Sequence, residues 1–192
     1  IRPMFEEGFY TDTQVITTVL SYDGIHQTEP LAICAASAAL TLSDIPFIKP
    51  IGAVRVGMVE DRFIINPTLE EMESSVLDLV LAGTEDAILM IEGYCDFLTE
   101  EQIMEAIEEG HEAIKIICQK LSDWQQVIGK PKNRESLRFM PQGLLEEVEA
   151  LMREPLQSAI RMTKKEEREK ALAVINDMVN KKLLPEENPL YA

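Results

Sequence analysis

The sequence predicts a mixed α/β (α+β) fold, with a sheet-and-helix core followed by an all-helical segment. Three observations indicate this class. Short runs with apolar residues at alternate positions, bounded by turn residues, lie before residue 95. Alanine-rich and amphipathic stretches separate and follow these runs. Beyond residue 143 the sequence becomes dense in Glu, Lys and Arg at i,i+4 spacing, which is typical of exposed helices.

Residues 1–47 predict an irregular segment, a strand and a helix. Residues 1–13 contain Pro3, Gly8 and scattered acids, and we expect an irregular entry segment. The β-branched run "TQVITTVLSYDG", residues 13–24, predicts a strand that ends in an Asp-Gly turn. Residues 31–40 are rich in Ala and predict a buried helix, which must end before Pro46 because the residue preceding a proline avoids the α region.

A hairpin and a short helix are expected next. In "GAVRVGMVEDRFIINPT", Val54, Val56 and Met58 alternate, and Glu60 and Asp61 make the turn to the returning arm. Thr68 then caps a short helix, with Glu71 at the capping-box position.

The stretch "LDLVLAGTEDAILMIEG", residues 77–93, predicts two buried strands joined near Gly83. After it, Thr99 caps a long helix that presents a mostly apolar stripe containing His111. Gly129, Pro131 and Pro141 bracket a basic stretch that we interpret as flexible. We therefore expect a core over residues 1–128, a linker over 129–143 and a helical segment over 144–192.

Composition and charge limit the classes of function that fit this chain. The 192 residues are 46% hydrophobic, enough for a sizeable core in one large domain or two small ones. The net charge is −16, and most of the excess lies in residues 1–140. This argues against a surface that coats nucleic acid, which needs clustered Lys and Arg. Charge interrupts every apolar run, so we expect no transmembrane helix and no membrane partner.

The cysteines and the first residue indicate the setting of the chain. Cys34, Cys95 and Cys118 show no CxxC spacing, and we expect them to be reduced core cysteines of a cytosolic protein. No signal peptide is visible. The chain begins at Ile1 rather than Met, and we expect it to come from the middle of a longer polypeptide.

Few residues suggest chemistry. The sequence has no GxxxxGK[ST], GxGxxG or HExxH motif, and its two histidines, His26 and His111, are interpreted as exposed and as packed against the core. Asp78 interrupts an apolar strand, so it is either a satisfied core acid or part of a catalytic site. Arg55 is a cation inside a strand, for which we expect an edge or partner-facing salt bridge. These residues alone indicate an α/β domain and a helical linker inside a larger protein.

Several phrases in order add a resemblance. "RPMF", "EEGFYTDTQVITTVLSYDG", "ASAALTLSDIPF", "PIGAVRVGMV", "FIINPT", "LDLVLAGTEDAILMIEG" and "GHEAI" resemble the polynucleotide phosphorylase family over residues 1 to about 120. Residues 140–192 resemble the helical linker of that family more loosely. The resemblance implies the later part of the first of two RNase PH-like cores, followed by the start of the all-helical domain.

The family resemblance implies a function. Members degrade single-stranded RNA from its 3′ end, using inorganic phosphate and Mg²⁺ to release nucleoside diphosphates, and can run in reverse. Three subunits form a ring around an RNA channel. The resemblance therefore implies RNA and phosphate as partners, a homotrimer, an RNA-degradation complex and a cytoplasmic location. Arg2 and Arg55 are the candidate RNA contacts within this segment.

In the family the catalytic carboxylates belong to the second core. There, two aspartates spaced six residues apart help hold Mg²⁺, and a lysine stands two residues after the second. Asp78 matches the second aspartate, but Met72 and Val80 stand where the other two residues would be. We therefore expect no metal and no catalytic residue here, and Asp78 is interpreted as a remnant of a metal-site position. The alternatives are a standalone structural or RNA-contacting subunit without activity, and an unrelated acidic metabolic enzyme on a similar fold.

Overall fold

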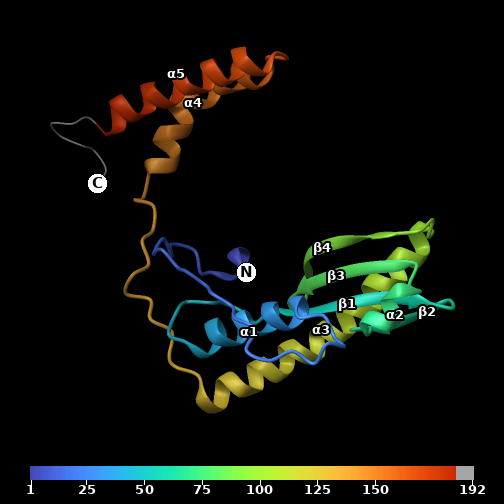
Figure 1. Cartoon of the computed structure of the whole chain (residues 1–192). Helices are drawn as coiled ribbons and strands as arrows, with labels where there is room; N and C mark the ends of the chain where they lie inside the picture. The colour runs from blue at the N-terminus through green and yellow to red at the C-terminus, as the bar shows by residue number, and fades with distance from the viewer. Residues whose placement is uncertain (185–192) are drawn as a thin grey trace. The chain divides into compact units, whose positions relative to one another are not determined.

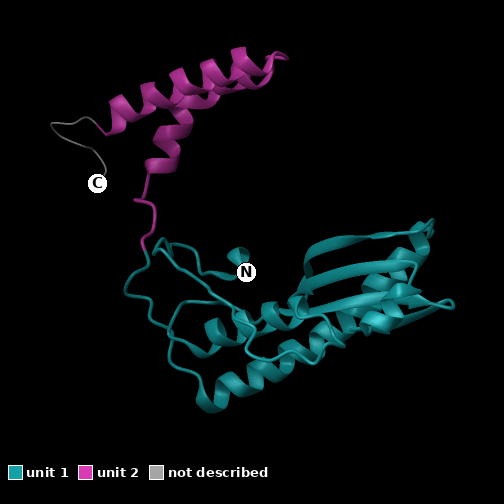
Figure 2. Cartoon of the chain, in the orientation of Figure 1, with its two compact units in different colours: residues 1–137 teal, residues 138–192 magenta. Residues whose placement is uncertain are grey.

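The computed structural model describes residues 1–184. It divides the chain into two compact units, with the boundary between Leu137 and Arg138 (Figure 2). The first unit combines a four-stranded sheet with helices, and the described part of the second is helical. The predicted α/β class is confirmed. None of the described helices is long and apolar enough to cross a membrane.

The sheet is antiparallel throughout, with strand order β2-β1-β3-β4 (Figure 1). Its strands are β1 (Gly52–Val59), β2 (Arg62–Ile65), β3 (Leu77–Gly83) and β4 (Ile88–Cys95). Both hairpins follow the sequence pattern. Glu60 and Asp61 take positive φ angles of 49° and 56°, as both central residues of a type I′ two-residue turn do.

Helix α3 (Glu100–Ile128) covers one face of this sheet (Figure 1). Apolar side chains of the two central strands and the helix are buried together there: Val54, Val56, Met58, Leu77, Leu79, Leu81, Ala106, Ile114 and Cys118. At the middle of the contact stands Gly110. A Cβ on this glycine would lie 2.4 Å from Leu81 Cδ1 and 3.0 Å from Val56 Cγ2, so its missing side chain lets the helix approach the strands.

Helix α1 (Glu29–Leu42) packs beside the start of β1 and begins a second apolar cluster. Its buried members are Leu40, Phe47, Ile51, Ala53 and Ala82. The first residues of the chain, including the 3-10 helix η1 (Arg2–Met4), join this cluster through Met4 and Phe5.

Two helix starts are capped by the threonines that the sequence indicates, Thr68 and Thr99. Helix α2 (Leu69–Glu73) has a full capping box, in which Thr68 Oγ1 accepts from the Glu71 amide and the Glu71 carboxylate accepts from the Thr68 amide. Thr99 and Gln102 form the same reciprocal pair at the start of α3. Each box satisfies amide groups that a helix start otherwise leaves unpaired.

The strand predicted over residues 13–24 is wrong. No strand is assigned there, and every residue from 11 to 26 is exposed. No backbone–backbone hydrogen bond of residues 14–22 occurs within the described part of the chain. The β-branched composition gives an extended backbone, but a strand also requires a partner strand, and this part of the chain supplies none. Only the turn follows the prediction, with Asp23 Oδ1 accepting from the amides of Ile25 and His26.

The prediction of three core cysteines is correct only in part. Cys118 is buried, Cys34 is half-buried, and Cys95 is exposed at the end of the edge strand β4. Burial raises the pKa of the Cys118 thiol to about 11 and also raises the pKa of Cys34. Both thiols therefore stay protonated near neutral pH and pack as small apolar groups.

The second unit contains helices α4 (Leu144–Ile160) and α5 (Lys165–Leu183). They pack through a small interface whose buried residues are Ala159, Ile175, Val179 and Leu183. Exposed apolar side chains remain on both helices, among them Leu145 and Val174. The end of the predicted helical segment, residues 185–192, lies outside the described residues.

Candidate functional site

Asp78 and Arg55 face each other across the two central strands. Arg55 Nε donates to Asp78 Oδ1 at 2.6 Å, and Arg55 Nη2 donates to Asp78 Oδ2 at 3.1 Å. Only 18% of the Asp78 side chain and 14% of the Arg55 side chain are exposed. A two-point guanidinium–carboxylate contact in such a sheltered place is a strong charge-assisted pair. It gives the carboxylate inside an apolar strand the partner that its burial requires.

This geometry corrects the expectation that Arg55 forms a salt bridge at a sheet edge or toward a partner. Strand β1 lies between β2 and β3, and the pair closes within the chain. The Arg55 amide donates to Asn66 Oδ1 at 2.9 Å, and the Asn66 amide donates back to the Arg55 carbonyl at 2.7 Å. Glu29 Oε2, on the first turn of α1, lies 3.8 Å from Arg55 Nη1. Arg55 therefore connects β1 to β3, to α1 and to the segment after β2.

This site does not fit a magnesium ion. Both Asp78 oxygens accept hydrogen bonds from Arg55, and a guanidinium beside them repels a divalent cation. Met72 and Val80, at the two related positions, carry no oxygen ligand. Within residues 1–184, no three His, Cys, Asp or Glu side chains are grouped closely enough to hold a metal ion.

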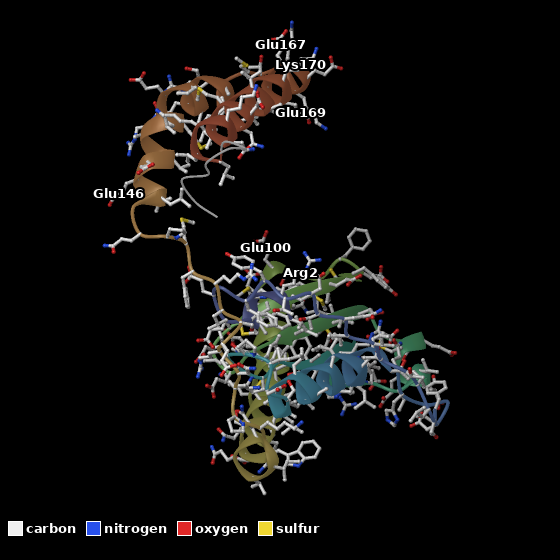
Figure 3. The ribbon with its side chains drawn as sticks, turned by 90° about the vertical axis from the view of Figure 1, so that its left-hand side faces the viewer. Arg2, Glu100, Glu146, Glu167, Glu169 and Lys170 are labelled. Carbon is white, nitrogen blue, oxygen red and sulfur yellow. The ribbon has the colours of Figure 1, made fainter. Side chains whose placement is uncertain are left out.

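The first candidate RNA contact, Arg2, lies apart from this pair. It belongs to η1 at the start of the chain and is exposed at the surface of the first unit (Figure 3). Within the described residues, no hydrogen bond or ion pair joins Arg2 to Arg55 or Asp78. The role of both arginines toward RNA stays a prediction.

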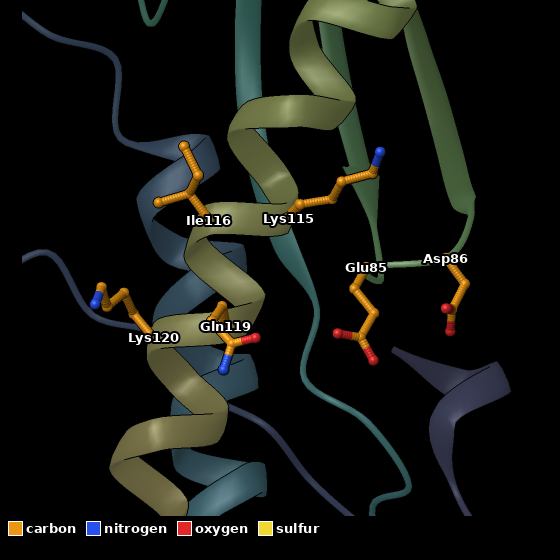
Figure 4. A pocket seen from close by; sticks show the side chains of 6 residues that line it. All are labelled: Glu85, Asp86, Lys115, Ile116, Gln119 and Lys120. Atoms are coloured by element: carbon orange, nitrogen blue, oxygen red, sulfur yellow. The ribbon is translucent and has the colours of Figure 1, made fainter.

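A shallow hollow of about 490 Å³ lies between α3 and the turn after β3 (Figure 4). Glu85 and Asp86 line it from the turn, and Lys115 and Lys120 line it from the helix. These charges already have partners. The Lys49 ammonium pairs with both acids of the turn. Lys115 Nζ donates to Glu112 at 2.6 Å, and Lys120 Nζ lies 3.8 Å from Asp123 Oδ2. The hollow therefore has no pattern of unmatched charge that would select a ligand.

Sequence reasoning missed the role of the basic stretch after α3. Lys132, placed in a flexible linker by composition, donates three hydrogen bonds to the end of α1, and Arg134 pairs with Glu6. Between 89 and 128 residues separate these partners along the chain. No local pattern reports a contact over such a distance.

Comparison with protein families matches both parts of the first unit. Residues 1–46 match the model of the 3′ exoribonuclease family, domain 1, and residues 49–113 match domain 2 of the same family. The two matches together cover more than half of the chain. The second match contains the whole sheet and the first half of α3.

Curated relatives match all or nearly all of the chain. The polyribonucleotide nucleotidyltransferase of Protochlamydia amoebophila is 57% identical over all 192 residues. That of Chlamydia felis is 44% identical over the same length. The probable chloroplastic polyribonucleotide nucleotidyltransferase 1 of rice is 46% identical over 93% of the chain. The chain spans 20–28% of the length of these three relatives.

Among solved structures, rice Rrp46 matches 53% of this chain and 47% of its own, with a TM-score of 0.45 and 23% identity. The two domain matches and the full-chain identities carry the assignment. The chain therefore belongs to the 3′ exoribonuclease family, as a segment of the polyribonucleotide nucleotidyltransferase type.

Proposed function

We propose that this chain is the later part of the first RNase PH-like core, and the start of the helical linker, of a phosphate-dependent 3′-to-5′ exoribonuclease. The complete polypeptide degrades single-stranded RNA to nucleoside diphosphates with inorganic phosphate, and extends RNA in the reverse direction. The observation that carries this proposal is the 57% identity along the whole chain to a polyribonucleotide nucleotidyltransferase of which the chain covers 28%.

Within that enzyme, the segment acts as a wall of the RNA channel rather than as a catalytic core. The contact between Arg55 and Asp78 supports this role, because it occupies the carboxylate that would otherwise be free to hold a metal. Mg²⁺ accordingly belongs to a site outside this segment. The same proposal includes a homotrimeric ring, a place in an RNA-degradation complex and a cytoplasmic location.

RNA contact within the segment falls first to Arg2 and second to Arg55. Arg2 is exposed, whereas Arg55 has 14% of its side chain exposed and is paired with a carboxylate. Photo-crosslinking of single-stranded RNA to the full-length protein, mapped by peptide, tests this order. We expect a salt-sensitive crosslink in the peptide containing Arg2. Crosslinks confined to peptides far from both arginines would remove them as RNA contacts.

The activity is tested by comparing two proteins, the full-length polypeptide and the 192-residue chain. Each is incubated with RNA, inorganic phosphate and Mg²⁺, and released nucleoside diphosphates are measured. We expect release from the full-length polypeptide and none from the 192-residue chain. Phosphate-independent release of monophosphates by the full-length polypeptide would contradict the phosphorolytic mechanism.

A second candidate is a structural or RNA-contacting subunit without activity of its own. The neutralised Asp78 site is compatible with it, because such a subunit needs no metal. Phosphate-dependent activity of the full-length polypeptide separates the two proposals. Absence of that activity in a correctly folded full-length protein favours the scaffold.

A further inference from the structure

The stretch that follows α3 begins with a contact to the end of α1. The Lys132 ammonium donates to the carbonyls of Leu40 at 3.0 Å, Thr41 at 2.9 Å and Ser43 at 2.8 Å. The last carbonyls of a helix lack partners inside the helix and carry its negative dipole end. An ammonium has three N–H donors, and here each of the three carbonyls receives one.

Backbone hydrogen bonds flank this contact on both sides. The Lys130 amide donates to the Leu42 carbonyl at 2.9 Å, and the Asn133 amide donates to the Asp44 carbonyl at 2.7 Å. The segment thus follows the chain that leaves α1 and fixes it at successive points. Its backbone is held as an ordered element would be, although no helix or strand is assigned to it.

An ion pair closes the far end of the segment. Arg134 Nε lies 2.9 Å and 2.8 Å from the two carboxylate oxygens of Glu6. The Glu6 amide in turn donates to the Pro46 carbonyl at 2.9 Å. Residues 130–134 therefore join three parts of the first unit: the start of the chain, the end of α1 and the end of α3.

We propose that residues 130–134 are a latch, pinned by Lys132, which sets the length of free chain before the helical unit. With the latch closed, only residues 135–143 separate it from α4. Nine residues span at most about 30 Å when extended. With the latch open, the free segment begins after Ile128 and spans at most about 50 Å. The latch is thus a conformational device that limits how far the helical unit can move from the core.

The contacts single out Lys132 rather than its neighbour. Lys132 is partly buried, whereas Lys130 is exposed. Burial lowers the pKa of the Lys132 ammonium, and the charge of Asp44 opposes that change. A neutral amine has only two N–H donors, so it cannot satisfy three carbonyls. The inference rests on these contacts alone and does not depend on the proposed function.

Hydrogen exchange of the 192-residue chain tests the latch. The variant Lys132→Met keeps the length of the side chain and removes its donors, and Lys130→Met is the matched control. We expect exchange of the two hydrogen-bonded amides of this segment, those of Lys130 and Asn133, to rise roughly ten- to a hundredfold in the first variant. Exchange in β1 and β3 should stay unchanged, and the control should behave as the wild type. Unchanged exchange of the amides at positions 130 and 133 would overturn the proposal, as would an equal rise throughout the first unit.

Limited trypsin digestion of the wild-type chain gives a test that requires no variant. With the latch closed, the peptide bonds after Lys132 and Arg134 are protected from trypsin, because the Lys132 side chain is hydrogen-bonded and the Arg134 side chain is in an ion pair. The bond after Arg138 lies beyond the latch and should be cut at least about tenfold faster. Equal rates of cleavage after Lys132 and after Arg138 would overturn the latch.

Discussion

At the scale of single residues, the pair between Arg55 and Asp78 explains the carboxylate inside an apolar strand. Its position could be read from the sequence, but its partner could not. The pairing depends on the register of β1 and β3, which places Gly57 opposite Asp78 and Arg55 opposite Val80. Two residues 23 positions apart meet only because of that register.

Removing the charge of Asp78 should destabilise the fold. We expect Asp78→Asn to lower the free energy of unfolding by about 3 kcal/mol, because it leaves the sheltered Arg55 cation with only the mostly exposed Glu29 carboxylate, 3.8 Å away, as a counter-charge. The double variant Arg55→Met, Asp78→Leu should lose less, since it buries no unpaired charge. Urea denaturation measures both, and Glu29→Gln serves as a control because its carboxylate is mostly exposed. A loss below about 0.5 kcal/mol in Asp78→Asn would contradict this account.

At the scale of elements, several local signals were accurate. The capping box of Thr68, the two-residue turn of the first hairpin and the long helix capped by Thr99 are set by residues close together in sequence. The run over residues 13–24 failed because its composition reports an extended backbone and carries no information about a neighbouring strand. Cys95 was misplaced for a related reason, since the sequence of β4 does not show that it is an edge strand.

In the contact between α3 and the sheet, two effects of opposite sign act on the stability of the variant Gly110→Ala. A glycine inside a helix costs about 1 kcal/mol relative to alanine, so helix propensity alone predicts that Gly110→Ala stabilises the protein. The close approach to Leu81 and Val56 predicts the opposite, and overpacking in a core costs about 1–3 kcal/mol. We expect a net loss of about 1 kcal/mol, measured by chemical denaturation, because both contacting side chains are fully buried.

An exposed position on the same helix provides the control for that measurement. Glu109→Ala removes a surface side chain next to Gly110 and should change the free energy of unfolding by less than about 0.5 kcal/mol. A stabilised Gly110→Ala variant would show that the sheet and helix accommodate the extra methyl group.

At the scale of the whole molecule, the contacts between distant parts of the chain could not be predicted from the sequence. The predicted linker over residues 129–143 contains the boundary between the two units. The expectation of flexibility does not hold for its first part, which is bound to α1 and to Glu6. Gly, Pro and basic residues indicate the end of an element, but they do not tell whether the following chain is free or bound.

The exposed extended segment should make the 192-residue chain associate. Val15, Ile16, Val19 and Leu20 are between 42% and 93% exposed, and the backbone around them has no partner within the described residues. Unpaired extended chain with apolar side chains promotes pairing with other molecules. We expect the sedimentation coefficient to rise with protein concentration.

A charged residue introduced into that segment tests whether its apolar side chains cause the association. Leu20→Lys should weaken the association, whereas Thr17→Lys adds the same charge and removes no apolar side chain. Sedimentation that is independent of concentration in the wild type would show that the segment does not drive association. An equal effect of both variants would attribute the association to charge alone.

The position of Lys132 in the chain also fixes an order of events during synthesis. Every strand of the sheet and the whole of α3 precede it, and translation adds about 5–20 residues per second. The carbonyls that Lys132 binds exist as a helix end only after α1 has formed. A nascent chain can therefore dock this lysine only after α1 has formed, and by then every strand of the sheet and α3 have been synthesised.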